Sequence, residues 1–176
     1  GGFSKERMCF DVKHYTLDIA INPDEKSIKG SNTIDFDIVQ TTQRIQLDLF
    51  ANMQVDSIIW NQKQLKYTRE FNAVFIDFPN TLEAETSQQI QFYYSGNPLI
   101  AKRAPWDGGF VFTKDKNNRP WIAVAVQGTG ASLWYPVKEG QSDEPDTGAD
   151  IRIAVPKELT NVSNGRLKAT IPMPNG

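Results

Sequence analysis

The sequence predicts an all-β fold, either a large curved antiparallel sheet or a β-sandwich, and three observations support this. Apolar and polar residues alternate in many short runs, turn-forming residues separate these runs, and no long segment holds an apolar face at helical spacing. The 176 residues are enough for one domain, since a chain of about 150 residues buries roughly 70% of its unfolded surface. No linker, repeat or low-complexity segment is visible, so we expect residues 1–176 to form a single domain.

Each alternating run predicts a strand with one face toward the core, because successive side chains of a strand point to opposite faces. Many short strands at such spacing are typical of a sandwich, a barrel or a curved sheet. In chain order, the predicted core-facing residues are Tyr15, Leu17, Ile19 and Ile21, then Ile34, Phe36 and Ile38, then Ile45, Leu47 and Leu49, then residues 55–59, then Val74 and Ile76, then Ile90, Phe92 and Tyr94, then Phe110 and Phe112, then Ile122, Val124 and Val126, and finally Ile151, Ile153 and Val155.

Turn-forming residues lie between the predicted strands. Residues 22–26 contain Pro and Asp, which favour turn dihedral angles, so we expect a long antiparallel hairpin around them. Residues 60–64 separate another pair of strands. The Asn164-Gly165 pair predicts a further hairpin, because a two-residue type I′ turn needs positive φ at both positions. Residues 80–89 are too polar and too short for more than a turn.

Composition excludes several classes of protein. The 19 Lys and Arg are scattered among 21 Asp and Glu, with a formal net charge of −2, so we expect no nucleic-acid partner. No apolar run approaches the roughly 18 residues of a membrane span, and the first residues do not resemble a signal peptide. The compartment therefore stays open between export, with the signal removed, and the cytoplasm. The chain ends just after a strand-like stretch, so we expect a fragment of a longer protein.

The inventory of metal ligands and catalytic groups is short. His14 is the only histidine and Cys9 the only cysteine, whereas a zinc site usually takes three or four such ligands. Cys9 has no base other than His14 to activate it, and His14 is predicted to lie on the exposed face of its strand. We therefore expect no metal site, no cofactor and no catalytic residue within this chain.

Two further features leave alternatives open. Acidic residues gather at 139–150, which can hold calcium, but their spacing does not fit a regular calcium loop and a solvated loop is the favoured interpretation. Trp60, Trp106, Trp121 and Trp134 are many tryptophans for this length. Exposed, they would form a platform for sugars; buried, they would be core, which is the favoured interpretation because aromatic burial stabilises small β domains.

Several segments resemble the zinc aminopeptidases of the M1 family, which includes aminopeptidase N and leukotriene A4 hydrolase. The sequence FDVKHYTLDI at 10–19 resembles the family's first strand, and IKGSNTI at 28–34 resembles its return strand. The sequence VQGTGASLWYP at 126–136, followed by Asp-Glu-Pro at 143–145, resembles its most telling motif. The resemblance covers nearly the whole chain, and it implies the all-β N-terminal domain of a metallopeptidase that removes residues from the amino terminus of peptides.

The resemblance also implies a substrate-binding site. Gln127 matches a family Glu or Gln that holds the α-amino group of the substrate, and an amide oxygen can accept a hydrogen bond from an ammonium. Gly128 lies beside it, where a small residue permits close approach of the substrate. The sequence departs from many members at Val137, where they carry cysteine, and in the longer loop at 138–141.

The family's His-Glu-x-x-His motif is absent from this sequence. The resemblance therefore implies that zinc and catalysis belong to a catalytic domain of the same polypeptide, and that this chain alone is inactive. The alternative hypothesis is a stand-alone β-sandwich module that binds carbohydrate or protein through Trp106, Trp121 and Trp134. That alternative predicts tryptophans on an open concave surface and Gln127 buried in the core.

Overall fold

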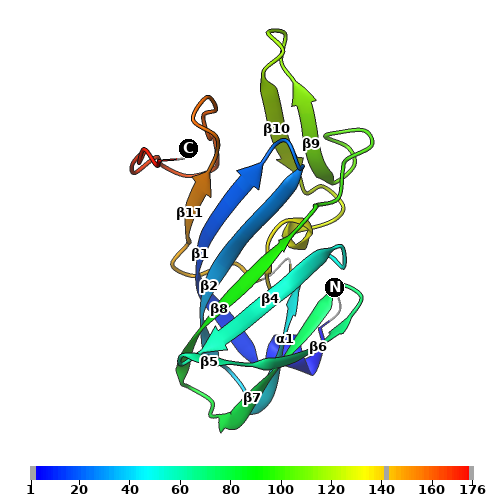
Figure 1. The fold of residues 1–176 in the computed structure, drawn as a ribbon. Helices are drawn as coiled ribbons and strands as arrows, with labels where there is room; N and C mark the ends of the chain where they lie inside the picture. The colour runs from blue at the N-terminus through cyan, green and yellow to red at the C-terminus, as the bar shows by residue number, and fades with distance from the viewer. Residues whose placement is uncertain (1–2, 141–142, 175–176) are drawn as a thin grey trace.

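The computed structural model describes residues 3–140 and 143–174, which form two sheets that share one core and a separate β-hairpin (Figure 1). Gln141 of the longer loop, Ser142 before the Asp-Glu-Pro motif, and residues 1–2 and 175–176 lie outside the described residues. The elements are α1 (Lys5–Met8), β1 (Phe10–Asn22), β2 (Ser27–Ile38), β3 (Thr42–Asp48), β4 (Met53–Trp60), β5 (Lys63–Gln64), β6 (Lys66–Glu70), β7 (Ala73–Leu82), β8 (Ser87–Gly96), β9 (Gly109–Lys114), β10 (Pro120–Ala125), the 3₁₀ helix η1 (Ala131–Leu133) and β11 (Ala149–Ala154).

The larger sheet has six strands in the order β11-β1-β2-β8-β4-β5. Its neighbouring strands are antiparallel except β11, which runs parallel to β1 at one edge. The predicted hairpin around residues 22–26 is confirmed, because β1 and β2 pair from Phe10 opposite Ile38 to Asn22 opposite Ser27. The side-chain oxygen of Asn22 accepts hydrogen bonds from the backbone amides of Asp24 and Glu25, which stabilises the turn.

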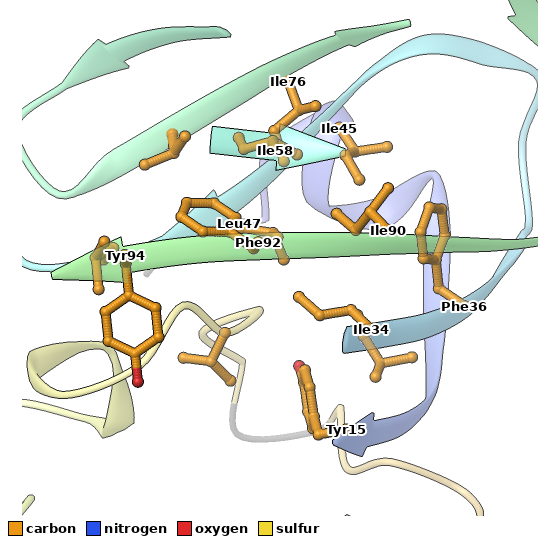
Figure 2. Packing of buried hydrophobic residues seen from close by; sticks show 14 of the residues in the cluster. Tyr15, Ile34, Phe36, Ile45, Leu47, Ile58, Ile76, Ile90, Phe92 and Tyr94 are labelled. Carbon is orange, nitrogen blue, oxygen red and sulfur yellow. The ribbon is translucent and has the colours of Figure 1, made fainter. Parts of the chain in front are cut away.

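The smaller sheet has three strands in the order β3-β7-β6, and its apolar face packs against the six-stranded sheet. Figure 2 shows Ile45 and Ile76 of this sheet on the side of the core opposite Ile34 and Ile90 of the larger sheet. These side chains are almost completely buried. Each such burial contributes about 1.5–3 kcal/mol relative to an exposed side chain. The predicted all-β sandwich is therefore confirmed, and the alternation identified its core correctly from residue 15 to residue 49, except for the partly buried Ile21, and again from 74 to 94.

The turn predictions had mixed outcomes. Asn61 and Gln62 both have positive φ and join β4 to β5 in a two-residue turn, as expected for residues 60–64. At 80–89, the strands extend further than predicted, and only residues 83–86 separate β7 from β8. The hairpin predicted at Asn164-Gly165 is wrong: Gly165 has the required positive φ, but the described residues 155–174 contain no strand. A turn-forming pair of residues is not sufficient for a hairpin, because the residues on either side must also pair as strands.

Candidate functional site

The strands β9 and β10 form a two-stranded hairpin that extends beyond the ends of β1 and β2 (Figure 1). Its base is tied to the preceding segment, because the Phe110 amide donates to the Leu99 carbonyl at 2.7 Å and the Ala101 amide donates to the Phe110 carbonyl at 2.9 Å. Phe110 is buried, and its ring packs edge-on against Trp134 with the ring centroids 6.4 Å apart. The hairpin is therefore anchored at its base.

A tight turn after β10 carries the predicted site residues Gln127 and Gly128. The Val126 carbonyl accepts hydrogen bonds from the amides of Thr129 at 3.2 Å and Gly130 at 2.9 Å. Gly128 and Gly130 have φ of 74° and 83°, a region that favours glycine. Gln127 and Gly128 are both exposed, and no atom of the described residues lies within 4 Å of where a Gly128 side chain would begin. The site therefore faces outward, and the backbone conformation is what requires glycine at position 128.

The segment after the turn returns to the core. The backbone of Val137 bridges Asp48, with amide-to-carbonyl distances of 2.8 and 3.0 Å, and the Phe50 amide donates to the Ser132 carbonyl at 2.8 Å. The buried amide of Asn32 donates to the Pro136 carbonyl at 2.8 Å. Residues 131–137 are thus hydrogen-bonded to β2, β3 and Phe50, and the turn leaves from a base that is tied to the core.

A buried carboxylate holds this base to the N-terminal helix. Asp48 accepts two hydrogen bonds from the Arg7 guanidinium, at 2.5 and 3.1 Å, and one from the Gln46 amide at 3.1 Å. The amide of Glu139 donates to the same carboxylate at 3.3 Å, and the Glu139 carboxylate accepts from the Ser132 amide at 2.8 Å. Asp48 therefore connects α1, β3 and the segment that follows the Gln127 turn. Sequence reasoning missed this network, because the alternation of β3 places Asp48 on the face opposite its core residues.

The acidic residues at 139–150 divide into two groups: Asp143 is largely buried, which corrects the favoured interpretation of a solvated loop at that position, whereas Glu144, Asp146 and Asp150 are exposed, as that interpretation predicts. Asp143 pairs with Lys138, and both side chains are largely buried. Lys138 also donates to the Phe10 carbonyl at 2.5 Å. Asp146 pairs with Lys13 on β1. The Lys138 hydrogen bond to Phe10 and the Asp146–Lys13 ion pair connect this segment to β1, whereas the Asp143–Lys138 pair lies within the segment. Among the described residues, no group of three or more His, Cys, Asp or Glu is placed to hold a metal ion.

Cys9 and His14 lie in different surroundings. Cys9 is buried, and burial raises the pKa of its thiol because an apolar environment disfavours the thiolate. His14 is half-buried rather than on an exposed face: its ring nitrogens lie 3.2 Å from the Thr147 hydroxyl and 3.4 Å from the Asp150 carboxylate. Thr147 and Asp150, which lie beside the ring, account for its partial burial on the face opposite Tyr15. Among the residues that the structure describes, His14 and Cys9 are not part of any group of three or more zinc ligands.

The tryptophans divide into two groups. Trp60 and Trp134 are half-buried and pack against the core, as predicted. Trp106 and Trp121 are 72% and 60% exposed, so the prediction that they are core residues is wrong. The hairpin and its base carry further apolar side chains that are substantially exposed: Leu99, Ile100, Val124 and Val126. The predicted core positions of Val124 and Val126 are therefore wrong as well. In the part of the chain that the structure describes, no helix is long and apolar enough to cross a bilayer.

Comparisons with known proteins agree with this fold. A family model described as the Peptidase M1 N-terminal domain matches residues 11–176, so the chain belongs to this family. No curated protein matches the sequence. The chain is similar in structure to an M1 zinc metallopeptidase from Deinococcus radiodurans, with a TM-score of 0.75, 19% identity, and coverage of 94% of this chain and 37% of that chain.

Two further solved structures share the fold. One is a mutant of a two-domain M1 zinc metallopeptidase bound to L-arginine, with a TM-score of 0.73, 19% identity, and coverage of 94% of this chain and 37% of that chain. The other is yeast LTA4 hydrolase in complex with bestatin, with a TM-score of 0.66, 12% identity, and coverage of 89% and 25%. The chain therefore spans 25% to 37% of the length of these solved structures and shares the architecture of that part.

Proposed function

We propose that this chain is the non-catalytic N-terminal domain of a zinc metallo-aminopeptidase, and that it forms one wall of the pocket for the amino terminus of the peptide substrate. The observation that carries the proposal is the position of Gln127, which is exposed on a turn whose following segment is fixed to the core. Zinc and the water that it activates belong to a catalytic domain of the same polypeptide, outside residues 1–176. The structural neighbours, which are zinc metallopeptidases and longer than this chain, support that division.

The chemistry of Gln127 suits the recognition of an ammonium group. Its amide oxygen accepts hydrogen bonds, and a substrate with a free amino terminus offers N–H donors that carry a positive charge. A hydrogen bond to a charged group contributes about 1.5–3 kcal/mol. Gly128 next to it has no side chain to block the approach of a substrate from the open side of the turn.

Apolar side chains near the turn support packing against a second domain. Val124 and Val126 are exposed and Val126 immediately precedes Gln127, while Trp106 is exposed before the hairpin and Trp121 is exposed on the opposite face of β10 from Val124. Exposed apolar surface of this kind is typical of an interface between domains or proteins. We assign the surface around Val124 and Val126 to the catalytic domain, because an N-terminus pocket at Gln127 requires that domain to lie close by.

A stand-alone binding module is the second candidate function, and the exposure of Trp106 and Trp121 is the observation that favours it. Two observations oppose it. Trp134 packs on the core instead of joining an open platform, and Gln127 is exposed instead of buried. Retention of the chain on insoluble polysaccharide, and loss of retention in the Trp121→Ala variant, would favour this second candidate.

Kinetics of the full-length enzyme test the proposal. Gln127→Ala should raise KM for peptides with a free amino terminus roughly 10- to 150-fold, because it removes one hydrogen bond to the substrate ammonium. Gln127→Glu keeps an acceptor oxygen and should stay close to wild type. Gln64→Ala, on the exposed strand β5, is the matched control and should change nothing. An unchanged KM in Gln127→Ala would remove the anchor role.

The fragment alone offers a complementary test. Purified residues 1–176 should release no amino-terminal residue from peptides when zinc is added, because their own side chains do not fit the metal. Zinc-dependent release of amino acids by this fragment would contradict the proposed division between the two domains.

A further inference from the structure

The turn that carries Gln127 ends against the carboxylate of Glu139. This carboxylate accepts a hydrogen bond from the Ser132 amide at 2.8 Å, in the first turn of η1. It also lies directly against Gly130, since a side chain beginning at Gly130 would overlap its oxygens. Glu139 therefore occupies the space beside the last residue of the turn and fixes the first residues that follow it.

Glu139 is itself held by buried groups. Its backbone amide donates to Asp48 at 3.3 Å, and Asp48 is bound by the Arg7 guanidinium and the Gln46 amide. The preceding residue, Lys138, is fixed by its ion pair with Asp143. A continuous series of hydrogen bonds thus leads from the core strand β3 to the end of the Gln127 turn.

The turn needs such support. Gly128 and Gly130 both have positive φ, and glycine backbones have many accessible conformations. Within the turn, the Val126 carbonyl is the acceptor for both closing hydrogen bonds. A displacement of about 1 Å in a substrate-positioning group can cost about 100-fold in rate. The direction of the Gln127 side chain therefore depends on what holds Gly130 in place.

We propose that Glu139 is a positioning residue for substrate binding: its carboxylate fixes Gly130 and Ser132, and thereby aims Gln127 at the amino terminus of the substrate, with the Arg7–Asp48 pair holding Glu139 from behind. This inference rests on the proposed role of Gln127. It assigns to Glu139 no contact with the substrate.

Variants of Glu139 in the full-length enzyme test the inference. Glu139→Ala should raise KM for free-amino peptides about 10-fold. Glu139→Asp, which keeps the charge but withdraws the carboxylate from Ser132 and Gly130, should raise KM in the same direction and is the safer variant for folding. Glu139→Gln keeps the acceptor oxygen and should restore KM to within about twofold of wild type. Glu144→Ala, an exposed carboxylate of the same segment, is the matched control and should leave KM unchanged. These fold-changes follow from the sensitivity of binding to placement.

The double variant Gln127→Ala with Glu139→Asp separates positioning from other effects. Because Glu139 acts through Gln127, the second substitution should add little once Gln127 is gone. Full additivity, or an unchanged KM in both Glu139→Asp and Glu139→Ala, would overturn the inference.

Failure of the proposed function gives a different result. If Gln127→Ala leaves KM unchanged, the anchor role fails, and crystal structures of wild type and Glu139→Asp then decide the structural half of the inference. A displaced turn at 126–130 supports the positioning contact, and an unmoved turn overturns it.

Discussion

The sandwich and the β9–β10 hairpin differ in how far their apolar side chains are buried. Ile34, Ile45 and Phe92 of the sandwich are completely buried between the two sheets. Trp121 and Val124 of the hairpin are substantially exposed, although the alternation of apolar residues predicted a core position for Val124. The buried side chains that stabilise the chain are therefore concentrated in the sandwich, whereas the hairpin leaves apolar surface exposed, which the proposed function assigns to contact with the catalytic domain. The segment 131–139 connects the two regions.

The largest effect is expected from breaking the sandwich. Phe92→Ala should lower the free energy of unfolding by about 3–5 kcal/mol, because it leaves a cavity in a fully packed core. Trp121→Ala in the hairpin is the matched aromatic control and should change it by less than about 0.5 kcal/mol in the isolated chain. Urea denaturation of both variants measures the difference. Similar losses in the two variants would erase the distinction between the regions.

A smaller effect is expected from the connection between the regions. Asp48→Asn keeps the shape of the side chain but removes the charge that binds Arg7, so unfolding free energy should fall by about 2–3 kcal/mol. Asp18→Asn, which alters an exposed pair with Arg152, should cost less than about 1 kcal/mol. Urea midpoints measure both variants. Equal costs would show that the buried network does not hold the 131–139 segment.

The smallest effects come from two buried tyrosines, whose pKa values are both raised because burial disfavours the phenolate. The Tyr15 hydroxyl accepts a hydrogen bond from the Lys138 amide at 3.2 Å, so Tyr15→Phe should destabilise the chain by about 1 kcal/mol. The Tyr94 hydroxyl is buried without a hydrogen-bond partner among the described residues, so Tyr94→Phe should stabilise it by up to about 1 kcal/mol. Thermal denaturation distinguishes the two signs. A loss in both variants would mean that the Tyr94 hydroxyl is satisfied.

The sequence was most informative where one strand face meets the core. Alternation identified Ile34, Phe92 and their neighbours because a second sheet covers that face within the same chain. It misassigned Val124 and Val126, because no layer of the described residues covers them as fully as the sandwich core. The periodicity of a strand does not show whether another layer of the fold covers its apolar face.

The burial of polar side chains could not be predicted from the sequence for a related reason. Asp48 is flanked by Leu47 and Leu49, so alternation places it outside, yet α1 and the segment around Glu139 cover that outer side. Both partners come from distant parts of the chain. The role proposed for Gln127 comes from the family motif rather than from any pattern in this sequence alone, and the structure adds that Gln127 is exposed and that the segment after its turn is hydrogen-bonded to the core.

The most direct test concerns the contact between Gln127 and an ammonium group. Inhibition constants of an amino acid and of its desamino analogue would be measured on the full-length enzyme, as wild type and as Gln127→Ala. We expect the substitution to raise the inhibition constant of the amino acid roughly 10- to 150-fold, because one hydrogen bond to the ammonium is lost, and to leave the inhibition constant of the desamino analogue unchanged. Equal weakening of both compounds, or of neither, would contradict this expectation.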